Sequence, residues 1–97
     1  MGPSFAELEF TDSALRHGFG PGDVGQLIRR RPLILRSRRG EENVYELLGR
    51  NAAGEYLHVV GRRQIRNGKR SFLVFHVSGM NERDRRRYRA VRRGRDG

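Results

Sequence analysis

The chain has 97 residues, and its 21 Lys plus Arg against 11 Asp plus Glu give a formal net charge of +10. This length supports one small hydrophobic core, so we expect a single domain over residues 1–97. The positive charge points to a polyanion as partner, and nucleic acid is the commonest polyanion that a protein meets. Because the chain has no cysteine, disulfides and thiolate metal sites are excluded.

Membrane and targeting signals are missing from the sequence. The longest uninterrupted apolar run, Phe72 to Phe75, is far too short to cross a membrane. The N-terminal residues also lack the basic and apolar regions of a secretory signal. We therefore expect a cytoplasmic protein.

The basic residues are almost all arginine, since Lys69 is the only lysine. Arginine's planar guanidinium binds phosphate through paired hydrogen bonds and stacks on bases, which suits RNA binding. A GC-rich genome would also turn lysine into arginine without functional meaning, and composition leaves both explanations open.

The first third of the chain contains signals for two helices. Residues 5–10 alternate apolar and acidic and fit a short strand or a lead-in segment. Thr11 or Asp12 can cap a short helix that ends at His17, because Gly18 tolerates the left-handed backbone of a helix end. A second helix over 21–31 is indicated by apolar residues at helical spacing, namely Val24, Leu27 and Ile28.

The middle of the chain changes to short β-rich runs, at 33–35, 44–48, 56–60 and 71–77. Asn67-Gly68 separates the last two runs and is a strong hairpin signal, because both residues accept a positive φ. Hairpins join antiparallel neighbours, so we expect a twisted antiparallel sheet of about four strands. Strict alternation in the last strand would place two sets of residues on opposite faces, Phe72, Val74 and His76 against Leu73, Phe75 and Val77.

The arginine-rich C-terminal segment is predicted to be a helix that begins after Asn81. Asn81 is a good N-cap, and Asp84 can reach back to the cap's amide and meet the positive end of the helix dipole. A narrow apolar seam of Met80, Asp84, Tyr88 and Val91 would pack on the sheet, with arginines covering most of the remaining surface. Residues 1–4 and 92–97 are expected to fray.

Candidate catalytic residues follow from what RNA cleavage without a metal requires. A base must take the 2′-hydroxyl proton, cations must hold the phosphorane charge, and a donor must protonate the leaving 5′-oxygen. His76, at the end of the last predicted strand, can serve as the base, although a histidine bonded to the backbone fits equally. Tyr88 can donate a proton or stack on a base, but its place on the apolar seam also fits a core residue. The carboxylate of Asp84 is assigned to capping of the predicted helix rather than to catalysis.

The remaining histidines and the arginine clusters are weaker candidates. A helix end favours the cationic His17 whatever its function, and His58 on a middle strand is by default a solvated residue. The three histidines lack metal-ligand spacing, so we expect neither a metal nor another cofactor. Arginines recur at element ends that can converge on one edge of the sheet. We expect Arg63 to hold the reacting phosphate and a further set to bind RNA phosphates, Arg62, Arg70, Arg83, Arg86 and Arg87.

Residues 74–88 resemble the closing motif of the BrnT toxin family. In that motif an apolar strand is followed by His or Ser, a small residue, Arg, any residue, Met or Ala, Thr, two variable residues, Glu, basic residues and Tyr. Here the matching positions are His76, Met80, Asn81, Asp84 and Tyr88. Upstream, the segments 16–18, 23–24, 48–54 and 57–60 are similar to the family's basic-His-Gly segment and its hairpin. The resemblance covers about residues 10–89.

The resemblance implies an α+β fold of the RelE-like type, with N-terminal helices, a twisted antiparallel sheet and a closing C-terminal helix. It also implies a toxin that cleaves RNA and is held inactive by a small antitoxin, which acts as a DNA-binding repressor as well. His76 and Tyr88 would then lie near the active surface. Where the motif has Arg, however, this chain has Ser78. Either Arg63, Arg70 or Arg83 replaces that cation, or the protein is a weak or inactive nuclease that still binds its partners.

Three functions remain open at this point. The first is a metal-independent endonuclease that cleaves mRNA, on the ribosome or free of it. The second is a non-catalytic module that binds nucleic acid through charge alone. The third is an interaction subunit whose cationic surface binds an acidic partner such as an antitoxin.

Overall fold

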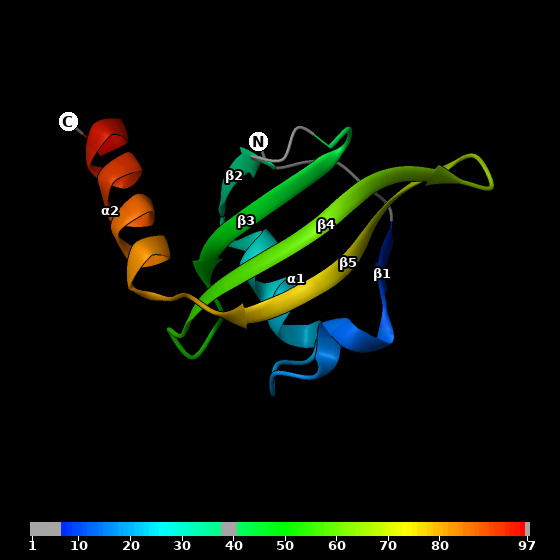
Figure 1. Cartoon of the computed structure of the whole chain (residues 1–97), viewed down its shortest axis with the longest axis horizontal. Helices are drawn as coiled ribbons and strands as arrows, with labels where there is room; N and C mark the ends of the chain where they lie inside the picture. The colour runs from blue at the N-terminus through cyan, green and yellow to red at the C-terminus, as the bar shows by residue number, and fades with distance from the viewer. Residues whose placement is uncertain (1–6, 38–40, 97) are drawn as a thin grey trace.

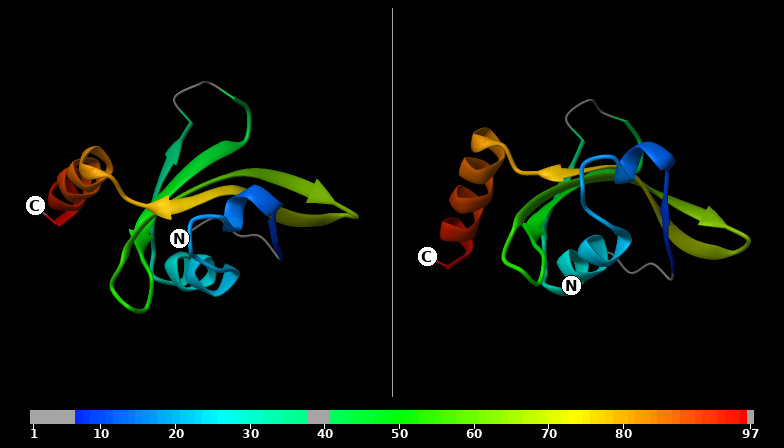
Figure 2. Two further views of the ribbon diagram at one scale, coloured as in Figure 1. Left: turned by 60° about the horizontal axis from the view of Figure 1, so that its bottom comes forward. Right: turned by 90° about the horizontal axis from the view of Figure 1, so that it is seen from below.

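The computed structural model describes residues 7–37 and 41–96, which form an α+β fold with α-helices on either side of one sheet (Figures 1 and 2). Along the chain the elements are β1 (Glu7–Phe10), the 3-10 helix η1 (Asp12–Leu15), α1 (Pro21–Arg29), β2 (Leu33–Arg36), β3 (Val44–Arg50), β4 (Tyr56–Arg66), β5 (Lys69–Gly79) and α2 (Glu82–Asp96). The α+β class and the closing helix are as predicted.

The sheet has five strands in the order β1-β5-β4-β3-β2. Strands β2 to β5 are antiparallel neighbours, which confirms the hairpin interpretation. β1, however, pairs in parallel with β5, so the sheet is mixed and the expectation of four antiparallel strands was wrong in this respect. Because β1 and β5 are far apart in the sequence, no hairpin turn signals their pairing. Glu9 of β1 accepts hydrogen bonds from the side chain of Ser71 on β5 and from those of Gln64 and Arg66 on β4.

Within the described part of the chain, only one N-terminal α-helix is present, whereas the sequence predicts two. The segment around Asp12 forms a single 3-10 turn, and no side chain caps it. The Thr11 hydroxyl lies 3.1 Å from the hydroxyl of Ser13 rather than on a backbone amide. The second predicted helix is α1, whose start is fixed by Pro21 and by the Asp23 carboxylate, which accepts from the Gly20 amide at 2.8 Å.

Strands β4 and β5 run well beyond the apolar segments that predicted them and form a two-stranded arm that projects from the body (Figure 1). At its tip Asn67 and Gly68 have φ angles of 52° and 73°, as the hairpin signal requires. The outer half of the arm is charged and exposed. Because these residues are not buried, the sequence has no alternation of apolar and polar residues there, and the extra strand length could not be predicted.

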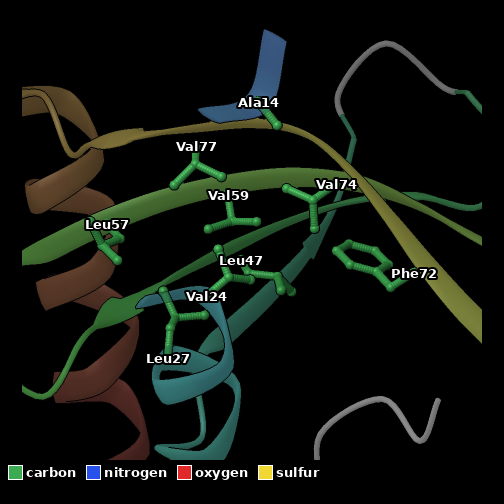
Figure 3. Packing of buried hydrophobic residues seen from close by; sticks show 9 residues of the cluster. All are labelled: Ala14, Val24, Leu27, Leu47, Leu57, Val59, Phe72, Val74 and Val77. Atoms are coloured by element: carbon green, nitrogen blue, oxygen red, sulfur yellow. The ribbon is translucent and has the colours of Figure 1, made fainter. Parts of the chain in front are cut away.

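The main core lies between α1 and one face of the sheet. Val24 and Leu27 of α1 are fully buried against side chains from β3, β4 and β5, which include Leu47, Leu57, Val59, Phe72, Val74 and Val77 (Figure 3). Neighbouring residues of β3 point to opposite faces, so Leu48 lies on the other side. There it packs with Leu33, Met80 and Tyr88 in a second cluster, which attaches α2.

A β-bulge in β5 changes which residues share the core face. Val60 pairs with His76 and Gly61 pairs with Val74, so Phe75 is an extra residue in β5. The predicted alternation therefore fails at this point. Phe72 and Val74 share the core with Val77, whereas His76 lies on the opposite face.

The start of α2 is as predicted. The Asp84 amide donates to Asn81 Oδ1 at 2.8 Å, and the Asn81 amide donates to Asp84 Oδ2 at 3.4 Å. Met80 and Tyr88 of the seam are 6% and 5% exposed. The helix extends to Asp96, through the residues expected to fray, whereas 1–4 lie outside the described residues. Among the described helices, none has the length and apolar character needed to span a membrane.

Candidate functional site

The three histidines of the chain meet on the sheet face opposite α1. His58 lies on β4, His76 lies on β5, and His17 lies in the connection between η1 and α1. The ring centroid of His76 is 5.6 Å from that of His17 and 5.5 Å from that of His58. The sequence gives no sign that these histidines meet, because no regular spacing links residues that come together only through the fold.

Two adjoining pockets of about 380 Å³ each are lined by two of these histidines, and they share Glu46, His58 and His76. We call them together the histidine groove. One half, toward α2, is lined further by Ser78, Gly79, Asn81, Arg83, Asp84 and Arg87. The other half is lined further by Ser37, Glu41, Val44, Val60 and Phe75. The groove therefore has a polar half and a half with apolar walls, with His76 between them.

His58 is held in place by a network of charged groups. Its Nε2 is 2.9 Å from Glu46 Oε1, and its Nδ1 is 3.9 Å from Asp84 Oδ2. Nη2 of Arg87 donates to both Glu46 Oε1 and Asp84 Oδ1, at 3.1 and 2.9 Å. The side chains of these four residues are only 10–18% exposed. His58 is therefore an oriented, part-buried residue, and the predicted phosphate ligand Arg87 is engaged with two carboxylates.

The charges of this network stabilise one another. Burial acts to raise the pKa of Glu46, but hydrogen bonds from Arg87 and His58 outweigh it and hold that pKa below its usual value. The hydrogen bond to Glu46 and the one to Asp84 raise the pKa of Arg87. Both groups therefore keep their charges, and the site has a fixed arrangement of carboxylate, guanidinium and imidazole.

His76 is the histidine best suited to accept a proton. Burial and the neighbouring His58 and His17 lower its pKa below the ordinary 6.5, and only Asp84 acts in the opposite direction. His76 is thus mostly neutral at pH 7. Its Nε2 lies 2.9 Å from Ser78 Oγ. When Nε2–H donates to that oxygen, Nδ1 carries the free lone pair.

Of the three cations considered for the position of Ser78, the fold brings Arg83 into the groove with His76. Arg63 and Arg70 lie elsewhere, around a hollow of about 420 Å³ on the arm with Asn43, Gln64 and Ile65. Arg86 is exposed on α2. Arg62 is 3.9 Å from Glu41, at the end of the apolar half. The predicted cations therefore do not form one cluster.

The two faces of the arm differ in charge. Arg66 and Lys69 pair across the strands, and each has an acidic partner, Glu9 at 2.8 Å and Glu7 at 3.9 Å. On the other face Ile65 pairs with Arg70 and is 76% exposed. Within the described residues, neither Arg70 nor Arg63 forms an ion pair with a carboxylate. One face of the arm thus keeps its positive charge.

Tyr88 packs in the second apolar cluster and is 5% exposed. Its ring lies edge-on to that of Tyr56, with 6.0 Å between the centroids. This location supports the core interpretation of Tyr88 that the seam had suggested. The phenol is not among the groups that line the histidine groove.

Several residues of the groove give no signal in the sequence, among them Glu41, Glu46 and Phe75. Glu46 on β3 gave no signal, because its partners His58 and Arg87 come from other elements. Phe75 had been placed on the face opposite His76, and only the bulge brings both to one pocket.

Over residues 7–37 and 41–96, no group of three or more His, Asp or Glu side chains is placed to hold a metal ion. Comparisons with protein-family models, with curated proteins and with solved structures find no match to this chain. Its likeness to the BrnT family therefore depends on the sequence motif alone.

Proposed function

We propose that this protein is an endoribonuclease that needs no metal, and that it is the toxin of a toxin-antitoxin pair of the kind its closing motif resembles. The observation that carries the proposal is the meeting of three histidine rings, two of which line one groove, in a protein with a net charge of +10. Imidazole is the side chain best suited to move protons at neutral pH, and the positive charge attracts RNA.

His76 acts as the general base in this proposal. Its lowered pKa makes the neutral ring the main form at pH 7, so it can take the proton from a ribose 2′-hydroxyl. The 2′-oxygen then attacks phosphorus, a new P–O2′ bond forms and the P–O5′ bond breaks. The products are a 2′,3′-cyclic phosphate and a 5′-hydroxyl end. The electron pair of the broken bond leaves with the 5′-oxygen, which must receive a proton.

His17 is the group that supplies that proton. It is exposed, its ring centroid lies 5.6 Å from that of His76, and its protonated form can donate to the leaving oxygen. Arg83, which lines the groove together with His76, would hold the non-bridging oxygens as negative charge develops on them. His58 is a positioning residue, since Glu46 already fixes its ring.

The test is cleavage of a single-stranded RNA by the purified protein in excess EDTA, with the RNA ends identified chemically. We expect 2′,3′-cyclic phosphate ends, and a loss of at least about 100-fold in rate for His76→Ala, the size typical of a removed general base. Leu73→Ala is the control, because it changes a half-buried residue of the same strand that lines neither half of the groove.

The toxin part of the proposal has its own test in growing cells. Expression of the wild-type chain alone should arrest growth, and His76→Ala should restore it. RNA binding without any cleavage in EDTA would overturn the nuclease, and toxicity that persists in His76→Ala would separate toxicity from this groove.

A further inference from the structure

The half of the histidine groove away from α2 has the character of a site for a flat apolar ring. Val44, Val60 and Phe75 form its apolar walls. Phe75 is half-buried and belongs to neither of the apolar clusters that α1 and α2 cover. A phenyl ring in that position offers a stacking surface, which proteins use to hold unpaired bases of RNA.

The β-bulge explains why this ring stands beside a histidine. An extra residue in β5 places Phe75 and His76 in the same pocket, although they are neighbours in a strand. Bulges are common next to active sites because they re-aim a side chain in this way. A base stacked on Phe75 would thus bring its own ribose to His76.

Besides the two histidines, the polar side chains of this half are those of Ser37, Glu41 and Glu46. Oε1 of Glu46 already accepts from His58 and Arg87. Among residues 7–37 and 41–96, the ion-pair partner of Glu41 is Arg62 at 3.9 Å, a loose contact, and the Glu41 side chain is 43% exposed. Glu41 is therefore the more exposed and more loosely held of the two carboxylates, and it can accept hydrogen bonds from a bound base.

We infer that the apolar half of the histidine groove is a nucleobase subsite that selects guanine, stacked on Phe75 and hydrogen-bonded to Glu41. This inference rests on the proposed function, whose substrate it specifies. Guanine alone among the four bases has two adjacent donors, N1–H and the N2 amino group, on the edge that would meet one carboxylate. Uracil presents two carbonyl oxygens beside a single N–H, and a carboxylate repels them. Cleavage would accordingly occur on the 3′ side of guanosine.

Binding of the four nucleoside 3′-monophosphates, measured by titration calorimetry, tests the inference without any need for cleavage. We expect 3′-GMP to bind at least tenfold more tightly than the other three. Glu41→Gln should remove most of that preference, whereas Glu7→Gln should keep it, since Glu7 has a matching loose ion pair, 3.9 Å from Lys69. Phe75→Leu should weaken all four nucleotides alike, because it keeps an apolar residue but lacks the ring. Leu73→Ala is its control.

The outcomes separate this inference from the nuclease. Equal affinity for all four nucleotides, or an unchanged guanine preference in Glu41→Gln, would overturn the guanine subsite even if the protein cleaves RNA. Tight, Glu41-dependent binding of 3′-GMP by a protein that cleaves no RNA would support the subsite and reject the nuclease.

Discussion

Ser78 Oγ lies 2.9 Å from Nε2 of His76, at the position where the BrnT motif has an arginine. Ser78, which lacks the positive charge of that arginine, is thus a hydrogen-bond partner of the proposed base His76. When Nε2–H donates to this hydroxyl, Nδ1 keeps the lone pair that the proposed base requires. The missing positive charge is supplied to the same groove by Arg83.

Replacement of Ser78 by alanine should lower kcat about fivefold and leave KM nearly unchanged. A single neutral hydrogen bond contributes about 1 kcal/mol, and that amount corresponds to about a fivefold change in rate. Ser78→Thr keeps the hydroxyl and should retain most of the rate. Steady-state kinetics on one RNA substrate measure both variants, and a change confined to KM would contradict the role of Ser78 in orienting the base.

Removal of the His58 imidazole should make His76 more basic. Burial lowers the pKa of His76 first, and the neighbouring His58 lowers it further. His58→Gln removes that second cause and keeps a partner for Glu46, so the pKa of His76 should rise toward 6.5. The acid limb of the rate profile should then move to higher pH, because the neutral base is lost earlier as the pH falls. Titration of the His76 ring protons by NMR measures the shift directly, and a fall in this pKa would contradict the electrostatic account.

Gly61 marks the place where the bulge brings β4 and β5 together. A Cβ atom at this position would lie 2.6 Å from Phe72 Cε2 and 2.7 Å from the Leu73 carbonyl oxygen. Gly61→Ala should therefore lower the free energy of unfolding by about 1–3 kcal/mol, the usual cost of overpacking. Gly22→Ala in α1, where nothing lies within 4 Å, is the matched control and should be neutral or mildly stabilising. Urea denaturation compares the two variants.

Asp84 joins the cap of α2 to the site, because it bonds to the Asn81 amide and to Arg87. Asp84→Ala should lower the free energy of unfolding by about 1–3 kcal/mol, since it leaves part-buried donors without their acceptor. Glu82→Ala, an exposed residue of the same turn, should cost much less. A similar loss in both variants, measured by thermal unfolding, would show that the helix dipole rather than the network is responsible.

The basic face of the arm should contribute to RNA affinity without contributing to chemistry. Loss of Arg63 and Arg70 should reduce the slope of log affinity against log salt by about 0.7 for each phosphate contact removed. The matched pair Arg66 and Lys69 should change the slope less, because Glu9 and Glu7 already engage those charges. Fluorescence anisotropy with a non-cleavable RNA measures this, and equal slopes for both double variants would remove the distinction between the two faces.

Local signals in the sequence predicted the elements that depend on neighbouring residues. The Asn67-Gly68 turn, the Asn81 cap and the α2 seam all appear where backbone preference and helical spacing placed them. The turn and the cap are decided by contacts within a few residues, and the seam is visible as apolar residues at helical spacing, so the local pattern is sufficient to predict them. The 3-10 turn at Asp12 is the local exception, since a cap residue cannot make an α-helix from four residues.

Features that depend on strand pairing between distant segments escaped prediction. The parallel pairing of β1 with β5 and the bulge at Phe75 are set by partners far along the chain. The bulge reversed the face assigned to His76 and thereby decided the composition of the site. His17, His58 and His76 share no spacing that would have announced their meeting.

The network around Glu46 also determines when this groove can exist during synthesis. The ribosome releases β3 and β4 before α2, so a nascent chain carries Glu46 and His58 before it carries Asp84 and Arg87. Until α2 packs, the carboxylate of Glu46 lacks the guanidinium that holds it, and the ring of His58 lacks the charge on its second side. The network is therefore complete only after α2 has been synthesised and has packed, and a nascent chain that ends within β5 lacks it.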